Sequence, residues 1–296
     1  MKGLFFLGVD PQQSSAQRAD DGAVTIGVAV DQREKQDREL APREADFRFG
    51  YVYHRFIKGF TSVQWAGFIH GLHQGFGFTN IGLDAGAGGG GINVMRHLAD
   101  RNQTIPTDIF FDGKARVDVV RNSVAREVRP ITPWDVPEPV DRQPILSLMK
   151  RGDVGIEQVF NERHAKWVGD DNFVDALQQE MNLALQTGRI GLLPTMAELD
   201  PHVYKDWTAE RLQILALSDQ LRKQLMGIAV KTVRDPSTGQ DRELRTAHGA
   251  RIYQFPARKD LAYSAIYSYM AFRIWLRFVE QGYVPESEDQ VWSVTF

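Results

Sequence analysis

The chain has 296 residues, a formal net charge of -3 and no cysteine. This length allows a sizeable buried core. The lack of cysteine excludes disulfides, thiolate metal sites and a cysteine nucleophile, and is typical of a reducing compartment. The nearly neutral charge excludes an overall basic field, so any nucleic-acid binding needs a local patch. Because we find no membrane-spanning apolar run and no leader before the first predicted strand, we expect a soluble protein of the cytoplasm.

The first predicted element is the apolar run 4–10, Leu-Phe-Phe-Leu-Gly-Val-Asp, which stops at a carboxylate. The run is too short for a helix and indicates a strand buried on both faces. A second run, 23–30, is rich in β-branched residues and is predicted to pair antiparallel with the first. Asp10 then lies at the mouth of a central hairpin, where the first strand meets solvent.

A third strand is predicted at 49–56, followed by a helix. Thr61 and Gln64 have the spacing of a capping box, and the apolar residues that follow recur with helical spacing. This helix is expected to cover the sheet. It also carries His70 and His73, three positions apart, for which a structural role is a simpler interpretation than metal binding.

A fourth strand, 79–84, again ends in an aspartate, Asp84. A glycine-rich turn and a helix at 92–99 follow it, an order that is typical of a parallel crossover. Between 104 and 157 the β-like runs are scattered around prolines, and we predict one strand there.

The C-terminal half is predicted to be mainly helical, with Asp260 at the beginning of the last helix. In chain order the predicted elements are helices at 160–167 and 173–187, an edge strand at 188–194, a helix at 209–226, a β-hairpin at about 228–254 and a helix at about 259–281. Six residues of the hairpin form the predicted basic patch for DNA phosphates: Lys231, Arg234, Arg242, Arg245, His248 and Arg251. A solvated hairpin without a partner explains the same residues equally well.

The glycine-rich turn matches Gly-x-Gly-x-x-Gly at Gly86, Gly88 and Gly91, a pattern found in dinucleotide-binding folds. A flexible turn is the simpler interpretation, because the unit does not open the α/β pattern and an acid would face the pyrophosphate. A sugar-kinase or actin-like ATPase also begins with a hairpin, but its second glycine loop usually joins two strands. No Gly-x-x-x-x-Gly-Lys-Ser/Thr sequence occurs, which excludes a P-loop ATPase.

Short segments along the chain resemble the nuclease domain of viral large terminase subunits, the RNase H-like enzymes that cut packaged DNA in tailed bacteriophages. The segments are the strand ending Gly8-Val9-Asp10 and residues 81–86, 160–163, 185–194, 220–225 and 259–265. The resemblance rests on their order and covers most of the chain. It implies one α/β domain over 1–296 of RNase H-like type, with a mixed central β-sheet and helices on both faces. The ATPase motor of the family is absent, so the chain resembles an excised domain or one half of a split enzyme.

The metal-binding acids of that family correspond to Asp10, Asp84 and Asp260. The resemblance implies that these residues are catalytic and hold two Mg²⁺ or Mn²⁺ ions, for which carboxylate oxygens are suitable ligands. In two-metal hydrolysis one ion activates water and the other stabilises the leaving oxygen, with Asp10 expected to bridge them. Asp21 and Lys259 are candidates for supporting these ligands. Each acid alone is also explained as a turn or helix-cap residue.

The predicted activity is therefore metal-dependent endonucleolytic cleavage of double-stranded DNA, as in the cutting of concatemers during packaging. The resemblance implies a terminase ATPase domain or subunit, a small terminase subunit and the portal as partners, with no membrane. Two alternatives remain open. One is a nuclease of the junction-resolvase or transposase type, and the other is a non-catalytic DNA-binding module of a packaging motor.

Overall fold

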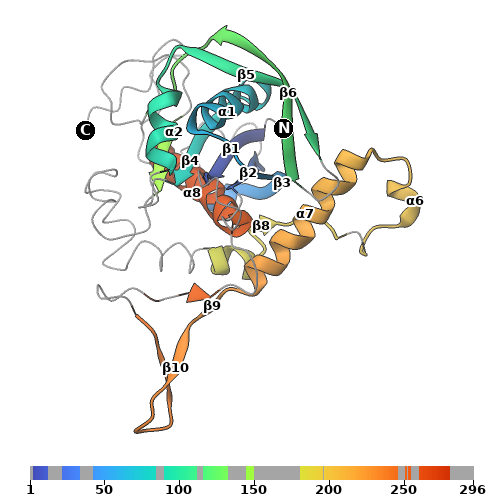
Figure 1. The fold of residues 1–296 in the computed structure, drawn as a ribbon. Coiled ribbons are helices and arrows are strands. Elements are labelled where there is room, and N and C mark those ends of the chain that lie inside the picture. Colours follow the sequence, from blue (N-terminus) through green and yellow to red (C-terminus); the bar gives the residue numbers. More distant parts are fainter. Residues whose placement is uncertain are drawn as a thin grey trace.

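The computed structural model describes residues 3–12, 22–33, 43–84, 90–111, 116–132, 145–149, 181–195, 197–245, 251, 253–254 and 260–280. Its centre is a mixed β-sheet (Figure 1). The strands of this sheet are β1 (Gly3–Asp10), β2 (Gly22–Asp31), β3 (Phe47–Ile57), β4 (Phe78–Asp84), β5 (Asn102–Phe111), β6 (Arg116–Glu127), β7 (Ile145–Met149) and β8 (Ile190–Gly191). Their order is β5-β6-β3-β2-β1-β4-β7, and β8 pairs with β3 outside this path.

The predicted central hairpin is confirmed. β1 and β2 pair antiparallel, from Gly3 opposite Val30 to Asp10 opposite Ala23, and β3 continues the antiparallel order beyond β2. On the other side, β4 pairs with β1 in parallel and β7 pairs with β4 in parallel. The parallel pairing predicted for the 79–84 strand is confirmed, but the chain passes through β5 and β6 at the other end of the sheet before it reaches β7. The carboxyl ends of β1, β4 and β7 meet at one edge of the sheet.

The stretch 104–157, where we predicted one strand and assigned nothing to the rest, contains more strand than that. β6 and β7 lie in this stretch, together with most of β5, and β5 and β6 form a long antiparallel arm. The register of this arm shifts beside Pro106, which has no N–H to donate to a partner strand. Such an irregularity interrupts the simple alternation by which strands are recognised in a sequence.

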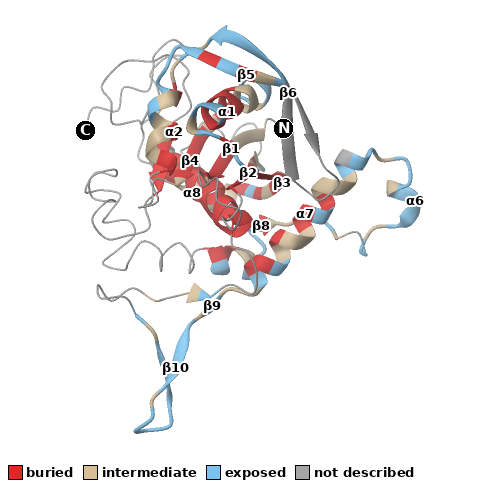
Figure 2. Ribbon diagram, viewed as in Figure 1, coloured by how far each residue is buried: buried red, intermediate tan, exposed pale blue. Residues whose placement is uncertain are grey.

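Helices cover both faces of the sheet. α1 (Ser62–Phe76) and α2 (Gly90–Leu98) lie on one face, and α7 (Ala209–Met226) and α8 (Asp260–Glu280) lie on the other. A short helix, α6 (Pro201–Tyr204), precedes α7. Figure 2 shows that buried residues concentrate in the central strands and along α8. The chain thus forms an α/β fold with a core on each side of one sheet.

α1 begins with the predicted capping box. The Gln64 amide N–H donates to the Thr61 hydroxyl at 3.3 Å, and the Gln64 side chain accepts from the Thr61 N–H at 2.9 Å. Both helix histidines have structural partners: His70 Nε2 lies 3.2 Å from the Leu98 carbonyl oxygen, and His73 Nδ1 accepts from the Phe78 N–H at 3.0 Å. These contacts join α1 to the end of α2 and to the beginning of β4.

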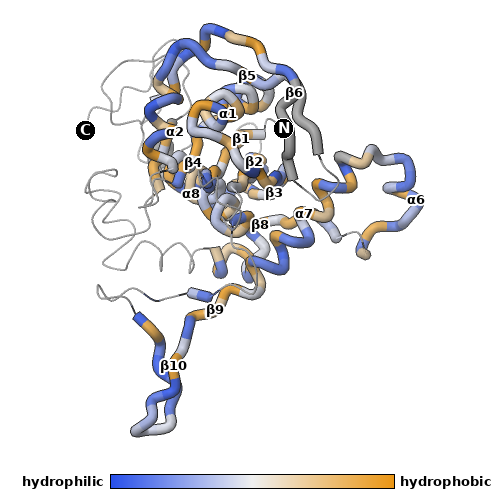
Figure 3. The backbone as a smooth tube through the Cα atoms, in the orientation of Figure 1, coloured by the Kyte–Doolittle hydropathy of each residue, from blue (hydrophilic) through white to orange (hydrophobic). Residues whose placement is uncertain are grey.

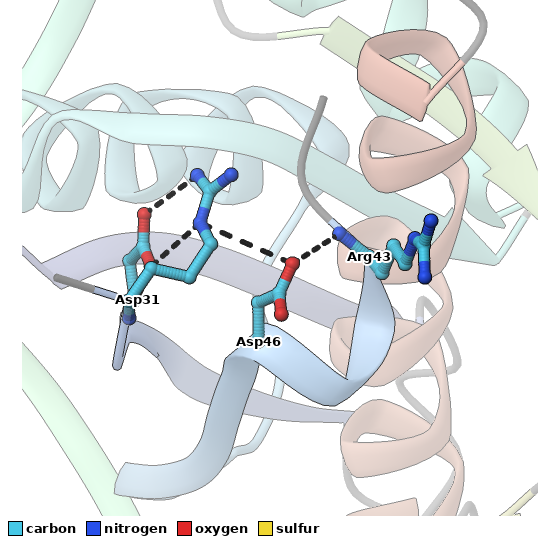
Figure 4. A network of polar contacts seen from close by, with 4 residues as sticks. Asp31, Arg43 and Asp46 are labelled. Atoms are coloured by element: carbon cyan, nitrogen blue, oxygen red, sulfur yellow. Dashed lines mark hydrogen bonds and ion pairs between the residues drawn. The ribbon is translucent and has the colours of Figure 1, made fainter. Parts of the chain in front are cut away.

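An ionic network fixes the two ends of the connection between β2 and β3 (Figure 4). The Arg33 guanidinium forms an ion pair with Asp31 at 2.8 Å and lies 3.9 Å from Asp46. Asp46 also accepts from the Arg43 N–H at 2.7 Å, in a turn of 3-10 helix that runs Glu44–Asp46. The end of β2 is therefore held against the beginning of β3 on the side of the sheet opposite the hairpin mouth.

The hairpin predicted at 228–254 follows α7. Its strands are β9 (Ala229–Val230), β10 (Thr232–Arg234), β11 (Asp241–Glu243) and β12 (Tyr253–Gln254), with β10 paired to β11 and β9 to β12. It projects from the rest of the chain (Figure 1), and hydrophilic residues predominate along it (Figure 3). No helix within the described ranges has the length and apolar character needed to cross a membrane.

Candidate active site

Asp10 and Asp84 end two neighbouring parallel strands on the same face of the sheet. The pairing of β1 with β4 places Val9 opposite Leu83, and each aspartate is the next residue along its strand. Val9 and Leu83 belong to the core under α1, so the aspartates point to the opposite face because side chains alternate along a strand. Neighbouring strands lie about 5 Å apart, which brings the two backbone positions together.

The helix α8 brings Asp260 to the same end of this face. A β-carbon added at Gly8 would come within 1.8 Å of the Ser264 carbonyl oxygen, so α8 lies directly on the backbone of β1. Further along the helix, the Ser268 hydroxyl donates to the Phe6 carbonyl at 3.0 Å, which shows that α8 runs antiparallel to β1.

The antiparallel direction of α8 and β1 determines where Asp260 and Asp10 lie relative to each other. Asp260 precedes Ser264 by one helical turn, about 6 Å along the axis. Asp10 follows Gly8 by two strand residues, about 7 Å in the same direction. Asp260 and Asp10 therefore reach the same edge of the sheet, one from the helix and one from the strand.

The three aspartates differ in exposure. Asp10 is 3% exposed and Asp260 is 1% exposed, whereas Asp84 is partly exposed. Carboxylates are rarely buried to this extent unless a hydrogen-bonding group or a cation compensates their charge. Their oxygens are ligands that Mg²⁺ and Mn²⁺ prefer. The chemistry and the placement of this acidic end therefore suit a hard divalent cation.

The side chains do not form a finished ligand set. Within the ranges that the structure describes, no three His, Asp or Glu side chains are grouped so that they could hold a metal ion. The predicted ligands share one face and one edge of the sheet, but a cation would have to draw their carboxylates together. The residues predicted to support them, Asp21 and Lys259, lie outside the described residues, as does His248 of the hairpin.

A buried polar chain that we did not predict lies next to Asp10. The Ser264 hydroxyl donates to the Leu261 carbonyl at 3.0 Å, so the 2.7 Å contact between Thr25 and Ser264 requires a proton from Thr25. The Thr25 oxygen can then only accept at its 3.2 Å contact with His54 Nδ1, which assigns the proton to that nitrogen. The chain ties the first turn of α8 to β2 and β3.

We predict that His54 makes folding stability depend on pH. Burial lowers the pKa of His54 from 6.5 to about 3, so below pH 6.5 the unfolded chain binds a proton that the folded chain excludes. The stabilising contribution is complete above pH 6.5 and falls on acidification. In urea titrations at pH 7.5 and 5.0, His54 is expected to account for about 2 kcal/mol of the parental loss, and the lowered pKa values of His70 and His73 add to that loss. His54→Gln should lose less free energy of unfolding on acidification, whereas the exposed control His202→Gln should match the parent. A His54→Gln variant whose stability has the parental pH dependence would contradict this assignment.

The basic residues of the hairpin are only partly available for DNA. Lys231, Arg234 and Arg242 are exposed, whereas Arg245 and Arg251 form ion pairs with Glu243 at 2.8 and 3.0 Å. Hydrogen bonds from these two arginines, the stronger from Arg251, lower the pKa of the Glu243 carboxyl. The positive charge is therefore partly neutralised within the hairpin itself.

The base of the hairpin is close in sequence to the acidic end. Six residue steps separate Gln254, the last residue of β12, from Asp260, and an extended chain of that length spans roughly 20 Å at most.

Comparison with known proteins assigns the chain to no family. The chain matches no family model, and no significant match was found among curated proteins or solved structures.

Proposed function

We propose that the chain is a metal-dependent DNA endonuclease of RNase H-like fold that uses two Mg²⁺ or Mn²⁺ ions. The observation that carries the proposal is the placement of Asp10, Asp84 and Asp260 at the same end of one face of the sheet, with two of the three nearly fully buried.

In this proposal the three carboxylates would hold the ions, with Asp10 shared between them because it lies on the central strand. Two bound metal ions would supply an activated water and would stabilise the leaving oxygen of a phosphodiester. The chain itself would supply the three carboxylates from two strands and one helix, and would bind DNA through the cations of the hairpin. Phosphate contacts of this kind carry little sequence preference.

The fold supports the same proposal at a coarser level. A mixed sheet with helices on both faces, together with a hairpin that carries several basic residues, is expected of a terminase-type nuclease domain. We extend the proposal to the partners of such a domain, which are a packaging ATPase, a small terminase subunit and a portal.

Cleavage of supercoiled plasmid tests the activity. The purified chain is expected to nick and linearise plasmid with Mn²⁺ or Mg²⁺ and to be inert with a chelator. A chain that binds duplex DNA but never cuts it with either metal would instead be the non-catalytic DNA-binding module. Binding and cutting should therefore be measured on the same preparation.

We predict that divalent metal stabilises the folded chain through Asp84. Because metal binds only the folded arrangement, the melting temperature should rise as the Mn²⁺ concentration passes the dissociation constant. Asp84→Asn removes one of three neighbouring negative charges, so it should slightly stabilise the metal-free protein and lose most of the Mn²⁺-induced shift. The control Asp206→Asn changes an exposed acid elsewhere and should retain the full shift. Equal shifts in the parent and in Asp84→Asn would mean that Asp84 is not a ligand.

We predict that the hairpin provides part of the DNA affinity. Lys231→Ala/Arg242→Ala removes two exposed cations that the hairpin does not use in the ion pairs with Glu243. If each contacts one phosphate, the slope of log affinity against log salt should fall by about 2. The control Lys205→Ala, an exposed cation outside the hairpin, should leave the slope unchanged. Fluorescence anisotropy with a labelled duplex across a salt series measures this, and an unchanged slope in the double variant would remove the hairpin from the DNA interface.

A further inference from the structure

A fully buried glutamine joins α7 to the first turn of α8. Gln224 is 0% exposed, and its side-chain oxygen accepts from the Ala262 N–H at 2.9 Å. Ala262 lies two residues after Asp260, the first residue of the helix. The bond therefore ends within the turn that carries the predicted metal ligand.

This bond stabilises the N-terminal turn of α8. The first N–H groups of an α-helix have no partner within the helix, and an end that lacks outside partners frays. The Gln224 oxygen satisfies one of these groups, and one turn after Asp260 the Ser264 hydroxyl is hydrogen-bonded to Thr25 of β2. Two buried hydrogen bonds to other elements thus hold the beginning of α8.

Core packing alone does not explain an amide at position 224. Its neighbours on α7, Leu221 and Leu225, are buried in the apolar core. Within the described part of the chain, the Gln224 amide nitrogen has no hydrogen-bond partner although it is buried. A buried polar atom without a partner costs stability, and an apolar side chain of similar size would avoid that cost. The amide oxygen offsets part of this cost through its hydrogen bond to the Ala262 N–H at the start of α8.

We infer that Gln224 is a positioning residue that holds the first turn of α8 so that Asp260 can bind metal. This inference rests on the proposed function, since it assigns Asp260 to the metal site. Residues outside a metal's coordination that orient its ligands commonly change metal affinity by about 10-fold to 100-fold when they are removed.

The test uses Gln224→Met, which keeps the size of the side chain and loses the acceptor. Hydrogen exchange with chelator present should show the Ala262 amide exchanging at least about tenfold faster, because its only described acceptor is gone. The Mn²⁺ concentration at half-maximal thermal stabilisation should rise about tenfold. Gln224→Glu keeps an acceptor oxygen and should retain the protection of the Ala262 amide.

Two controls separate positioning from general destabilisation. Gln220→Met makes the same chemical change one turn earlier on α7, where the glutamine is only partly buried, and should leave both readouts at parental values. Leu221→Ala removes a buried core side chain on the same helix. It should lower the melting temperature without moving the Mn²⁺ midpoint or selectively exposing the Ala262 amide.

The outcomes distinguish this inference from the proposed function. A parent without any Mn²⁺-induced shift would contradict the metal site and, with it, the role of Gln224. A parent that binds Mn²⁺ while Gln224→Met keeps the parental midpoint would overturn the positioning role alone. Unchanged Ala262 exchange in Gln224→Met would overturn it as well, and that measurement needs no metal.

Discussion

The Asp10→Asn variant is expected to fold like the parent and to cleave plasmid DNA more slowly by a factor of about 10³ or more, because several kcal/mol of transition-state stabilisation depend on the metal ions. Asp10 lies on the central strand between β2 and β4, and in the proposed site its carboxylate would be a ligand of the metal ions. Asparagine has nearly the same shape but no charge. The rate of supercoiled-plasmid loss at fixed Mn²⁺ concentration measures the effect.

The control for this experiment is Asp206→Asn, which neutralises an exposed acid away from the sheet edge and should cut at the parental rate. Far-ultraviolet circular dichroism and a thermal melt show whether Asp10→Asn is folded. A folded Asp10→Asn protein that cuts at the parental rate would refute the assignment of Asp10 and leave the cleaving site elsewhere.

The Gly8→Ala variant is expected to be destabilised by about 3 kcal/mol or more, or not to fold. The new methyl group would meet the backbone of α8, at 1.8 Å from the Ser264 carbonyl oxygen and 2.4 Å from the Ser268 nitrogen. Backbone atoms of a buried helix cannot move aside as a flexible side chain can, so the helix must lift from β1. Urea denaturation gives the loss in the free energy of unfolding.

Gly75→Ala is the matched control because nothing lies within 4 Å of the added carbon and the residue is in α1. Its expected effect is a gain of up to about 1 kcal/mol, the helix propensity of alanine over glycine. If Gly8→Ala were as stable as the parent, α8 could not lie on β1 as described. The placement of Asp260 beside Asp10 would then be wrong as well.

Local sequence patterns determined many of the individual elements. The apolar run that ends at Asp10 and the β-branched run after it are too short for helices, which predicts two strands. These strands pair across the single loop that connects them. Thr61 with Gln64 marked the start of α1, and the predicted helix 209–226 coincides with α7. Such patterns succeed because capping and periodicity depend on residues within a few positions of one another.

Sequence reasoning failed where partners are distant or the pattern is irregular. The arm of β5 and β6 was missed because the register shift beside Pro106 breaks its alternation. The hydroxyl contact between Thr25 and Ser264 spans 239 positions, and nothing near either residue indicates the other. His54 and Gln224 are polar residues whose sequence neighbours give no sign that they are fully buried.

In the candidate site, too, the sequence predicted the local positions and only the structure showed the distant contacts. The sequence by itself placed Asp10 and Asp84 at strand ends and Asp260 at a helix start, because apolar runs end there. Only the tertiary structure decided that all three share one face, since a shift of one residue in register would turn a strand-end acid to the other face. The bare backbone of Gly8 lets α8 lie directly on β1 and brings Asp260 to the same end of the sheet, through a contact between residues 256 positions apart that no local pattern can specify.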